Sequence, residues 1–332
     1  DLASKKVRRL TKGNICNDRD GMLDYSWSPD GKWLVAVVDM HRRSPYFDIA
    51  IINAADGTIT NITNSAYMNQ SPRWVMGGDA ILFLSDRYGM RSHASWGSQY
   101  DGLLAFTNQA AYDRFRLSPE DFQLQKELKA SRAKAAAKPA AKADGKKKAD
   151  SKADKDKADK SDKDKDSKTI NVELDGITDR IVRLTPFSAS MSDAYIDDQG
   201  ETLWFLAQVD NGYDLWKKDL RKGTVSLASK LGARPTGMQP AAAGKTLFLT
   251  GGGAIRKMSL PGGKIDGVSF SATQKFDAAA EREYMYDYML TEAEKRFFGT
   301  DMNGTDWKAM GKAYPKFLPH ISHNADFAEL TS

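Results

Sequence analysis

A short pattern occurs four times in the chain: a turn that contains glycine, followed by a run of large apolar residues. The first copy is Ser-Pro-Asp-Gly with the apolar run 33–38 behind it. Turn residues of this kind tolerate the backbone angles of a tight turn, and branched or aromatic residues suit a pleated, half-buried strand. Each copy therefore predicts a turn followed by a β-strand. The copies begin at Ser28, Gly77, Asp197 and Ala242.

A second pattern follows and extends each copy into a four-stranded unit. Residues 47–63, FDIAIINAADGTITNIT, align without a gap with residues 213–229, YDLWKKDLRKGTVSLAS. Both segments have an aromatic residue, an aspartate, an apolar strand, a Gly-Thr turn and a second apolar strand. Residues 254–270 are a looser third copy. Such repeated units are typical of β-propeller blades, whereas unrelated hairpins in a sandwich would not explain the ungapped alignment.

The spacing of the copies predicts a large insertion. Gly31 and Gly78 are 47 residues apart, and Gly200 and Gly244 are 44 apart, but Gly78 and Gly200 are separated by 122. Because one blade takes about 44 residues, one blade carries roughly 78 additional residues. We place this insertion at residues 90–168 and expect an all-β partial propeller of about four blades over residues 1–275. The segment KVRRLT (6–11) matches RIVRLT (180–185), which predicts that the chain opens on the last strand of an earlier blade.

The positive charge of the chain lies in the insertion. The chain has a formal charge of +5, but residues 131–168 alone carry +6, so the remainder is close to neutral at −1. This composition excludes a basic nucleic-acid-binding face. Residues 131–168 also contain no Val, Ile, Leu, Met or aromatic residue. Such a segment cannot bury enough apolar area to offset its ordering entropy, so we predict a disordered linker, preceded by a helix that begins after Ser118.

Residues with recognisable active-site or metal chemistry are scarce. The single cysteine, Cys16, excludes an internal disulfide and a Cys-based zinc site, and none of the four histidines has metal-ligand spacing. The chain has no Gly-x-Ser-x-Gly elbow, His-Glu-x-x-His motif, P-loop or Gly-x-Gly-x-x-Gly fingerprint. We therefore expect no metal, no cofactor and no catalytic residue. No apolar run approaches the roughly 20 residues of a membrane helix.

One loop remains as a candidate recognition site. In RYGMRSHASWGSQ, residues 87–99, Arg91, His93 and Trp96 follow the end of a predicted strand, where loops often carry binding residues. A structural turn with a packed tryptophan is the alternative. A second candidate surface is a channel along the propeller axis. The innermost strands that would line it are expected near residues 23–27, 71–74, 192–195 and 236–239.

From Asp277 the pattern changes from strand to helix. Tyr284, Met285, Tyr288 and Met289 recur at helical spacing, which we interpret as a core stripe of a helix that ends at Gly299. Another helix is predicted near Asn324, and we interpret its short length as truncation. Residues 276–332 are therefore expected to be the helical start of a second domain.

The order of these features resembles the tricorn-type proteases, serine peptidases related to the carboxyl-terminal processing peptidases. The strongest match is residues 297–332, where a Gly-x-Asp-Trp turn leads through a Pro-rich bend into a helix. The resemblance implies seven-bladed propellers, a PDZ-like module, a mixed α/β peptidase core and a large homo-oligomer. It places the catalytic histidine and serine after this sequence. No catalytic residue is carried over, and His320 and His323 are not assigned to that role.

We therefore expect a non-catalytic propeller segment of a tricorn-like serine peptidase, which guides or filters peptides or unfolded polypeptide toward an active site outside the chain. One alternative is a TolB-like propeller that acts as a protein-binding module. Another is the gating propeller of a prolyl-oligopeptidase-type enzyme. Whether the chain should be classed as an enzyme stays open, because the peptidase would be the parent protein. The lysine-rich, cysteine-poor composition favours the bacterial periplasm, with the cytoplasm as the alternative.

Overall fold

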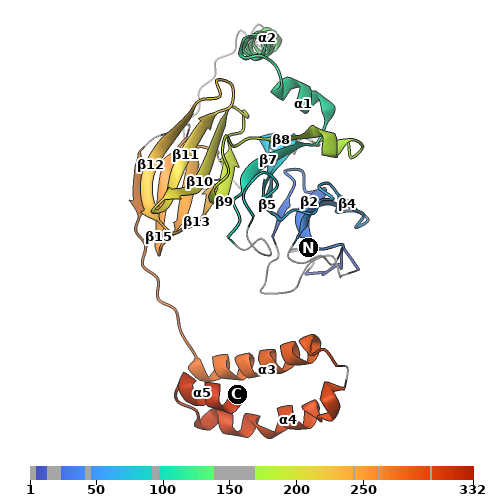
Figure 1. The fold of residues 1–332 in the computed structure, drawn as a ribbon, viewed down its shortest axis with the longest axis vertical. Helices are drawn as coiled ribbons and strands as arrows, with labels where there is room; N and C mark the ends of the chain where they lie inside the picture. Colours follow the sequence, from blue (N-terminus) through green and yellow to red (C-terminus); the bar gives the residue numbers. More distant parts are fainter. Residues whose placement is uncertain are drawn as a thin grey trace, which may run out of the picture. The chain divides into compact units, whose positions relative to one another are not determined.

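The computed structural model describes residues 5–12, 24–41, 46–91, 97–137, 169–241, 244–260, 262, 264–299 and 301–332. The chain divides into two compact units, residues 1–269 and residues 270–332. The first unit is mostly β-sheet and the second is helical (Figure 1). Each unit is described by itself below.

In its described residues the first unit has four antiparallel sheets of four strands each, which we call blades 1 to 4. Along each blade the strands follow one another in chain order, as propeller blades do. The all-β propeller predicted from the repeats is thereby confirmed. The strands are β1 Tyr25–Trp27, β2 Trp33–Val38, β3 Asp48–Asn53 and β4 Ile59–Asn61; β5 Asn69–Val75, β6 Ala80–Ser85, β7 Asp101–Phe106 and β8 Ile181–Arg183; β9 Ser190–Ile196, β10 Thr202–Asp210, β11 Gly212–Asp219 and β12 Val225–Ala233; β13 Pro235–Pro240, β14 Thr246–Gly251, β15 Ala254–Ser259 and β16 Ile265–Val268.

The repeated turn has the same backbone geometry in three blades. Gly31, Gly200 and Gly244 have φ values of 67°, 68° and 66°, the left-handed region that favours glycine. Each glycine N–H donates to a carbonyl oxygen three residues earlier, at 2.8 to 2.9 Å. In blade 1 the side chains add to the turn, because the Ser28 hydroxyl donates to Asp30 and accepts from the Trp33 N–H. The sequence repeat therefore encodes the turn between the first two strands of a blade.

The aspartate of the second repeat pattern ties the third strand to the end of its blade. Asp48, at the start of β3, accepts hydrogen bonds from Thr63 Oγ1 and the Ser65 N–H. Asp101, at the start of β7, accepts in the same way from Thr185 and Ser188. In blade 3 the equivalent aspartate, Asp214, accepts from the backbone N–H groups of Leu231 and Gly232. The sequence comparison found the first and third of these aspartates but not Asp101.

Three apolar cores fill the spaces between neighbouring blades. One joins blades 1 and 2 around Ile49, Ile51 and Phe83. The second joins blades 2 and 3 around Phe106 and Phe205, and the third joins blades 3 and 4 around Trp204 and Leu247. Each sheet thus buries a face against the next one.

The insertion leaves blade 2 between its third and fourth strands. Helix α1, Gln109–Phe115, and helix α2, Pro119–Ala137, follow β7, and a short 3-10 helix, Ile177–Arg180, leads into β8. Ser118 caps α2 as predicted, since its hydroxyl accepts from the Asp121 N–H. The range 90–168, which we assigned to the insertion, contains strand β7 at residues 101–106. Of the predicted linker 131–168, residues 131–137 end α2, and residues 138–168 lie outside the described residues.

The opening segment differs from the prediction. Residues 5–12 form no strand, although 6–11 match the end of blade 2 in sequence. The segment is tied instead by the Arg8 side chain, which donates to the carbonyl oxygens of Ala54 and Ala55 in the β3–β4 turn. An isolated strand-like sequence is not stable without a partner strand, and residues 5–12 pair with no strand in the described part of the chain.

Over residues 270–299 and 301–332, the second unit has three α-helices and two 3-10 helices. They are α3 Ala278–Arg296, η6 Met302–Gly304, α4 Trp307–Ala313, η7 Pro315–His320 and α5 Asn324–Thr331. Asp277 caps α3, and α5 begins where the sequence predicted it. The predicted core stripe is wrong in part, because Tyr284 and Tyr288 are exposed and stack on each other. The buried face of α3 is offset from that stripe and contains Arg282 and Tyr286.

Candidate functional site

The innermost strands of the propeller are the first strand of each blade. β1 lies against β5, and β9 lies against β13, so the first strands of neighbouring blades contact each other. These strands occupy residues 25–27, 69–75, 190–196 and 235–240, which include or overlap the four ranges expected for the inner edge. The surface predicted to line a channel is therefore formed by β1, β5, β9 and β13.

Arg73 on β5 joins three of these four strands. Its Nη2 forms an ion pair of 2.7 Å with Asp193 on β9, and its Nη1 donates to the carbonyl oxygen of Met238 on β13 at 3.1 Å. The second carboxylate oxygen of Asp193 accepts from the Met238 N–H at 2.7 Å. The guanidinium and the carboxylate thus connect blades 2, 3 and 4 at their inner edge.

A second aspartate connects blade 1 to the same group. Asp24, directly before β1, accepts a hydrogen bond of 2.7 Å from the Ser71 N–H on β5. Burial raises the pKa of the Asp24 carboxyl, and the nearby Asp193 charge raises it further, while Ser71 and Arg73 act in the opposite direction. The Trp74 indole on β5 also donates to the Ser26 carbonyl oxygen at 3.1 Å. We call Asp24, Ser71, Arg73 and Asp193 the inner-edge network.

The inner-edge network is polar and internally paired. It contains one guanidinium, two carboxylates and several backbone groups, which hydrogen-bond to one another across the blades. Among the residues whose positions are known, no group of three or more His, Cys, Asp or Glu side chains could hold a metal ion.

The predicted recognition loop is described only in part. Arg91 is exposed, and its guanidinium carbon lies 4.9 Å from the centroid of the Tyr67 ring. His93 and Trp96 lie outside the described residues, so the grouping of these three side chains stays a prediction. The base of the loop is closed by the Gln99 N–H, which donates to the Met90 carbonyl oxygen.

The sequence did not single out the inner-edge residues. Arg73 and Asp193 are 120 residues apart in the chain, and their pairing depends on how blades 2 and 3 pack. The sequence did contain one indication of these residues. Two of the predicted inner strands include a charged residue, Arg73 in SPRWV and Asp193 in SDAY. A charge in such a strand calls for a partner, because an unpaired buried charge is costly.

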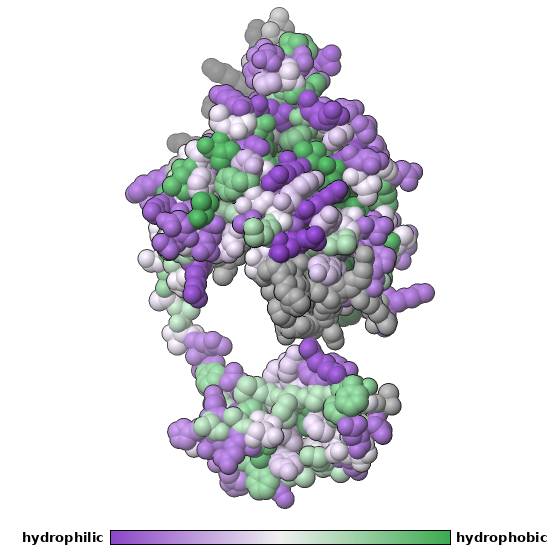
Figure 2. All heavy atoms as spheres, viewed as in Figure 1, coloured by the Kyte–Doolittle hydropathy of each residue, from purple (hydrophilic) through white to green (hydrophobic). Residues whose placement is uncertain are grey.

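The helical unit has a separate groove of about 710 Å³. It is open on one side and lies between α3, α4, η7 and α5, with mostly apolar walls. Two hydrogen bonds hold those walls together, from the Trp307 indole to the Leu290 carbonyl oxygen and from the Tyr286 hydroxyl to the Gly311 carbonyl oxygen. His320 is among the residues that line the groove. Figure 2 shows apolar residues exposed on the surface of this unit.

Comparisons with known proteins found matches to both units of the chain. Residues 278–332 match the family model of the tricorn protease C1 domain. No curated protein matches the chain in sequence. A crystal structure of the tricorn protease aligns with 99% of this chain at 12% identity and a TM-score of 0.60. At this identity the likeness shows the fold alone, and this chain spans only 30% of the length of that one.

Other propellers align less closely. TolB from Acinetobacter baumannii aligns with 79% of this chain and 45% of its own, at 15% identity and a TM-score of 0.42. A structure from a study of two prolyl endopeptidases aligns with 74% of this chain and 26% of its own, at 12% identity and a TM-score of 0.40. In the part of the chain that the structure describes, no helix has the length and apolar character needed to cross a membrane.

The two parts of the chain follow each other directly, with propeller blades first and a segment matching the tricorn protease C1 domain after them. The matched segment covers the three helices α3, α4 and α5. The fold likeness to the tricorn protease extends over nearly the whole chain. The chain is thus a tricorn-like propeller joined to a C1-like helical segment.

Proposed function

We propose that this chain is the non-catalytic propeller segment of a tricorn-like serine peptidase, and that it guides or filters peptides toward an active site outside residues 1–332. The observation that carries the proposal is the inner-edge network. A polar inner edge suits the passage of an extended peptide, whose backbone N–H and C=O groups need hydrogen-bonding partners wherever water is excluded. Arg73, whose side chain is 22% exposed, is one of the partly exposed members that a passing peptide could contact, together with Asp24 and Ser71.

The proposal includes the setting of the protein. Its partners are peptides or unfolded polypeptide, and the full-length peptidase is a homo-oligomer. We place it in the bacterial periplasm. The match of residues 278–332 to the C1 domain supports the link to a peptidase, since a propeller by itself occurs in many unrelated proteins.

Photocrosslinking tests the proposed path. An unfolded peptide with benzoylphenylalanine at alternate positions would be incubated with residues 1–332, irradiated and mapped by mass spectrometry. We expect adducts on β1, β5, β9 and β13. The matched control is the same peptide with phenylalanine in place of benzoylphenylalanine, which cannot form photoadducts and should leave the inner strands unmodified. Adducts confined to β4, β8, β12 and β16 would contradict the proposal.

An activity assay tests the non-catalytic part of the proposal. Residues 1–332 should not cleave fluorogenic peptides, because the chain contains no Gly-x-Ser-x-Gly nucleophile elbow. Cleavage that a serine-directed inhibitor abolishes would refute this expectation. Reading the coding sequence on both sides tests the link to a peptidase, which requires a downstream His and Ser in a peptidase core.

A further inference from the structure

Five side chains of arginine and tyrosine alternate at one end of blade 2. The guanidinium carbon of Arg91 lies 4.9 Å from the Tyr67 ring centroid. That of Arg87 lies 5.8 Å from Tyr67 and 5.6 Å from Tyr88, and that of Arg183 lies 5.0 Å from Tyr88. We call this group the Arg–Tyr ladder; in chain order its members are Tyr67, Arg87, Tyr88, Arg91 and Arg183.

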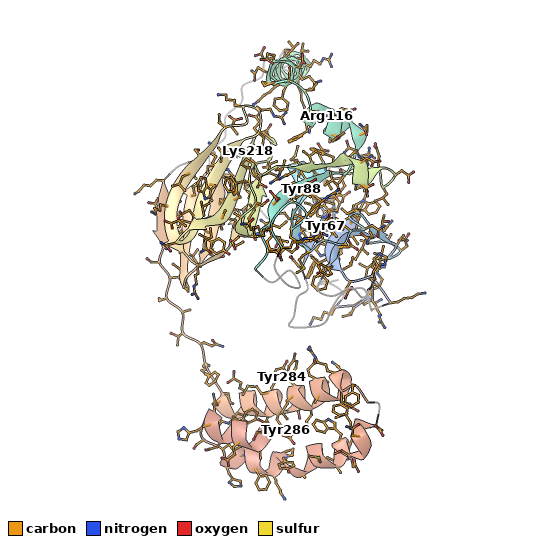
Figure 3. The ribbon with its side chains drawn as sticks, in the orientation of Figure 1. Tyr67, Tyr88, Arg116, Lys218, Tyr284 and Tyr286 are labelled. Carbon is orange, nitrogen blue, oxygen red and sulfur yellow. The ribbon has the colours of Figure 1, made fainter. Side chains whose placement is uncertain are left out.

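The ladder combines side chains from three connections that leave the sheet on the same side. Tyr67 lies between β4 and β5, residues 87–91 follow β6, and Arg183 ends β8. Because neighbouring strands of a blade are antiparallel, the start of β5, the end of β6 and the end of β8 lie at one end of the blade. The insertion helices leave from the opposite end, after β7. Figure 3 shows Tyr67 and Tyr88 close together, in the part of the view where Figure 2 shows strongly hydrophilic residues.

Two of the three arginines have donors available to a ligand. Arg183 is committed, since it forms an ion pair with the buried Asp101 at 2.8 Å. Arg87 and Arg91 are exposed and form no ion pair with any residue that the structure describes. A guanidinium that contacts tyrosine rings can still donate from its edge, and its fork of N–H donors matches the two oxygens of a carboxylate. Contact with the rings also restricts the side chains before a ligand arrives, which lowers the entropy lost on binding.

From these observations we infer that the ladder binds acidic segments of extended polypeptide, with Arg87 and Arg91 receiving Asp or Glu side chains and the tyrosines contacting neighbouring apolar residues. This inference rests on the proposed function and names a class of substrate for it. A peptide fits better than a nucleic acid, because a nucleic acid gains its affinity from a long row of cations. Within the described residues the ladder has two arginines without an ion pair, and the chain outside residues 131–168 carries a net charge of −1.

Fluorescence anisotropy with matched peptides tests the inference. The probe is a labelled, C-terminally amidated peptide of alternating Glu and Phe, and its control has Gln at every Glu. The double variant Arg87→Gln/Arg91→Gln should bind the Glu peptide about tenfold more weakly than the unaltered chain. Arg87→Lys/Arg91→Lys keeps the charge but loses the planar fork, and should lie between them. The control variant Arg116→Gln/Arg132→Gln makes the same charge change at two exposed arginines, Arg116 directly after α1 and Arg132 in α2. Arg116 also lies over a tyrosine, Tyr112.

Each outcome decides the inference. A selective loss for the Arg87/Arg91 variant, seen with the Glu peptide and absent with the Gln peptide, supports it. Equal affinities of both double variants overturn it. Binding that requires a free C-terminal carboxylate, or tighter binding of an oligo(U) RNA, also overturns it, because the ligand would then be of another class. If the ladder binds the Glu peptide but no photocrosslinks form on the inner strands, the proposed guiding function fails. If the ladder does not bind the Glu peptide but photocrosslinks do form on the inner strands, only this inference fails.

Discussion

Arg73 and Asp193 lie on the inner strands of neighbouring blades and form an ion pair of 2.7 Å, in which the carboxylate side chain is only 8% exposed. Asp193 also accepts from the backbone of β13, and Arg73 donates to it. The pair therefore connects three blades at once. Its removal should weaken the packing of the propeller at its inner edge more than the loss of a surface pair would.

The first prediction is that Arg73→Met lowers the free energy of unfolding by about 2–3 kcal/mol, because it leaves the Asp193 carboxylate buried without its cation. Urea unfolding followed by tryptophan fluorescence measures the change. The control is Lys264→Met, which breaks an ion pair whose lysine is 86% exposed and should change the free energy of unfolding far less than Arg73→Met does. Equal losses in both variants would show that the inner-edge pair contributes little.

The second prediction concerns the aspartate of the blade motif. Asp101 is fully buried and accepts from Thr185 Oγ1, Ser188 Oγ and Arg183 Nε, so Asp101→Asn removes the charge that three donors face. We expect a loss of about 3 kcal/mol in unfolding free energy. The control is Asp56→Asn in the exposed β3–β4 turn, where an amide oxygen can still accept from the Thr58 N–H. A similar loss at both positions would contradict the role assigned to the motif.

The third prediction concerns pH. Burial raises the pKa of Asp24 above its ordinary value of 3.8, so the folded state binds this proton more tightly than the unfolded state does. The contribution of Asp24 to stability is therefore greatest at acid pH and is lost as the pH rises from the ordinary pKa through the raised one. Asp24→Asn should be as stable as the unaltered chain at pH 7, or more stable, and should show a smaller decline between pH 4 and pH 7 in urea unfolding.

Asp30 is the control for this prediction, because its pKa moves the other way. Burial raises the pKa of Asp30, but hydrogen bonds from Ser28 and from the backbone N–H groups of Ile170 and Lys32 outweigh it and lower the pKa. Stability from Asp30 is therefore present above pH 4 and lost in acid, so Asp30→Asn should be less stable than the unaltered chain at pH 7. The third prediction fails if Asp24→Asn shows the same loss.

The fourth prediction concerns the docking of the insertion. Arg221 lies 4.8 Å from the Phe115 ring and 4.1 Å from the Phe122 ring, and it donates to the Phe115 carbonyl oxygen. Phe122→Ala removes the ring that Arg221 contacts and leaves the ion pair of Lys126 on α2 with Glu201 beside β10, so limited proteolysis should cut residues 117–137 several times faster while the sheets stay intact. Leu128→Ala, at a 48% exposed position of α2, is the control and should change the cleavage rate little. Equal rates would show that Arg221 does not hold the helix.

The sequence predicted features that local residues determine. The turn glycines, the Ser118 cap and the start of α5 follow from neighbours a few positions away. The sequence pattern did not identify Asp101 as the equivalent of Asp48 and Asp214, because the loop before β7 is longer than the loops before β3 and β11. The sequence could not show that Tyr284 and Tyr288 are exposed. Two aromatic residues four positions apart share one face of a helix whether that face is buried or exposed, and they can contact each other in either case.

Features that depend on packing between blades could not be predicted. Arg73 finds Asp193 only because β5 and β9 lie at the same edge of neighbouring sheets. The Arg–Tyr ladder likewise needs three connections to end at one side of blade 2. In both cases the residue types were visible in the sequence, but apart from the neighbours Arg87 and Tyr88 the partners lie 20 to 120 residues away.

The position of the insertion has a consequence for how the chain tolerates change. Strand β8 is three residues long and pairs with β7, although residues 107–180 separate the two strands along the chain. The entropy lost in closing such a loop grows only with the logarithm of its length, so doubling the enclosed stretch would cost about 0.6 kcal/mol more. The same doubling in a tight hairpin turn would shift or break the register of its strands. Blade 2 can therefore gain or lose dozens of residues at this point over evolutionary time while the propeller around it keeps its shape.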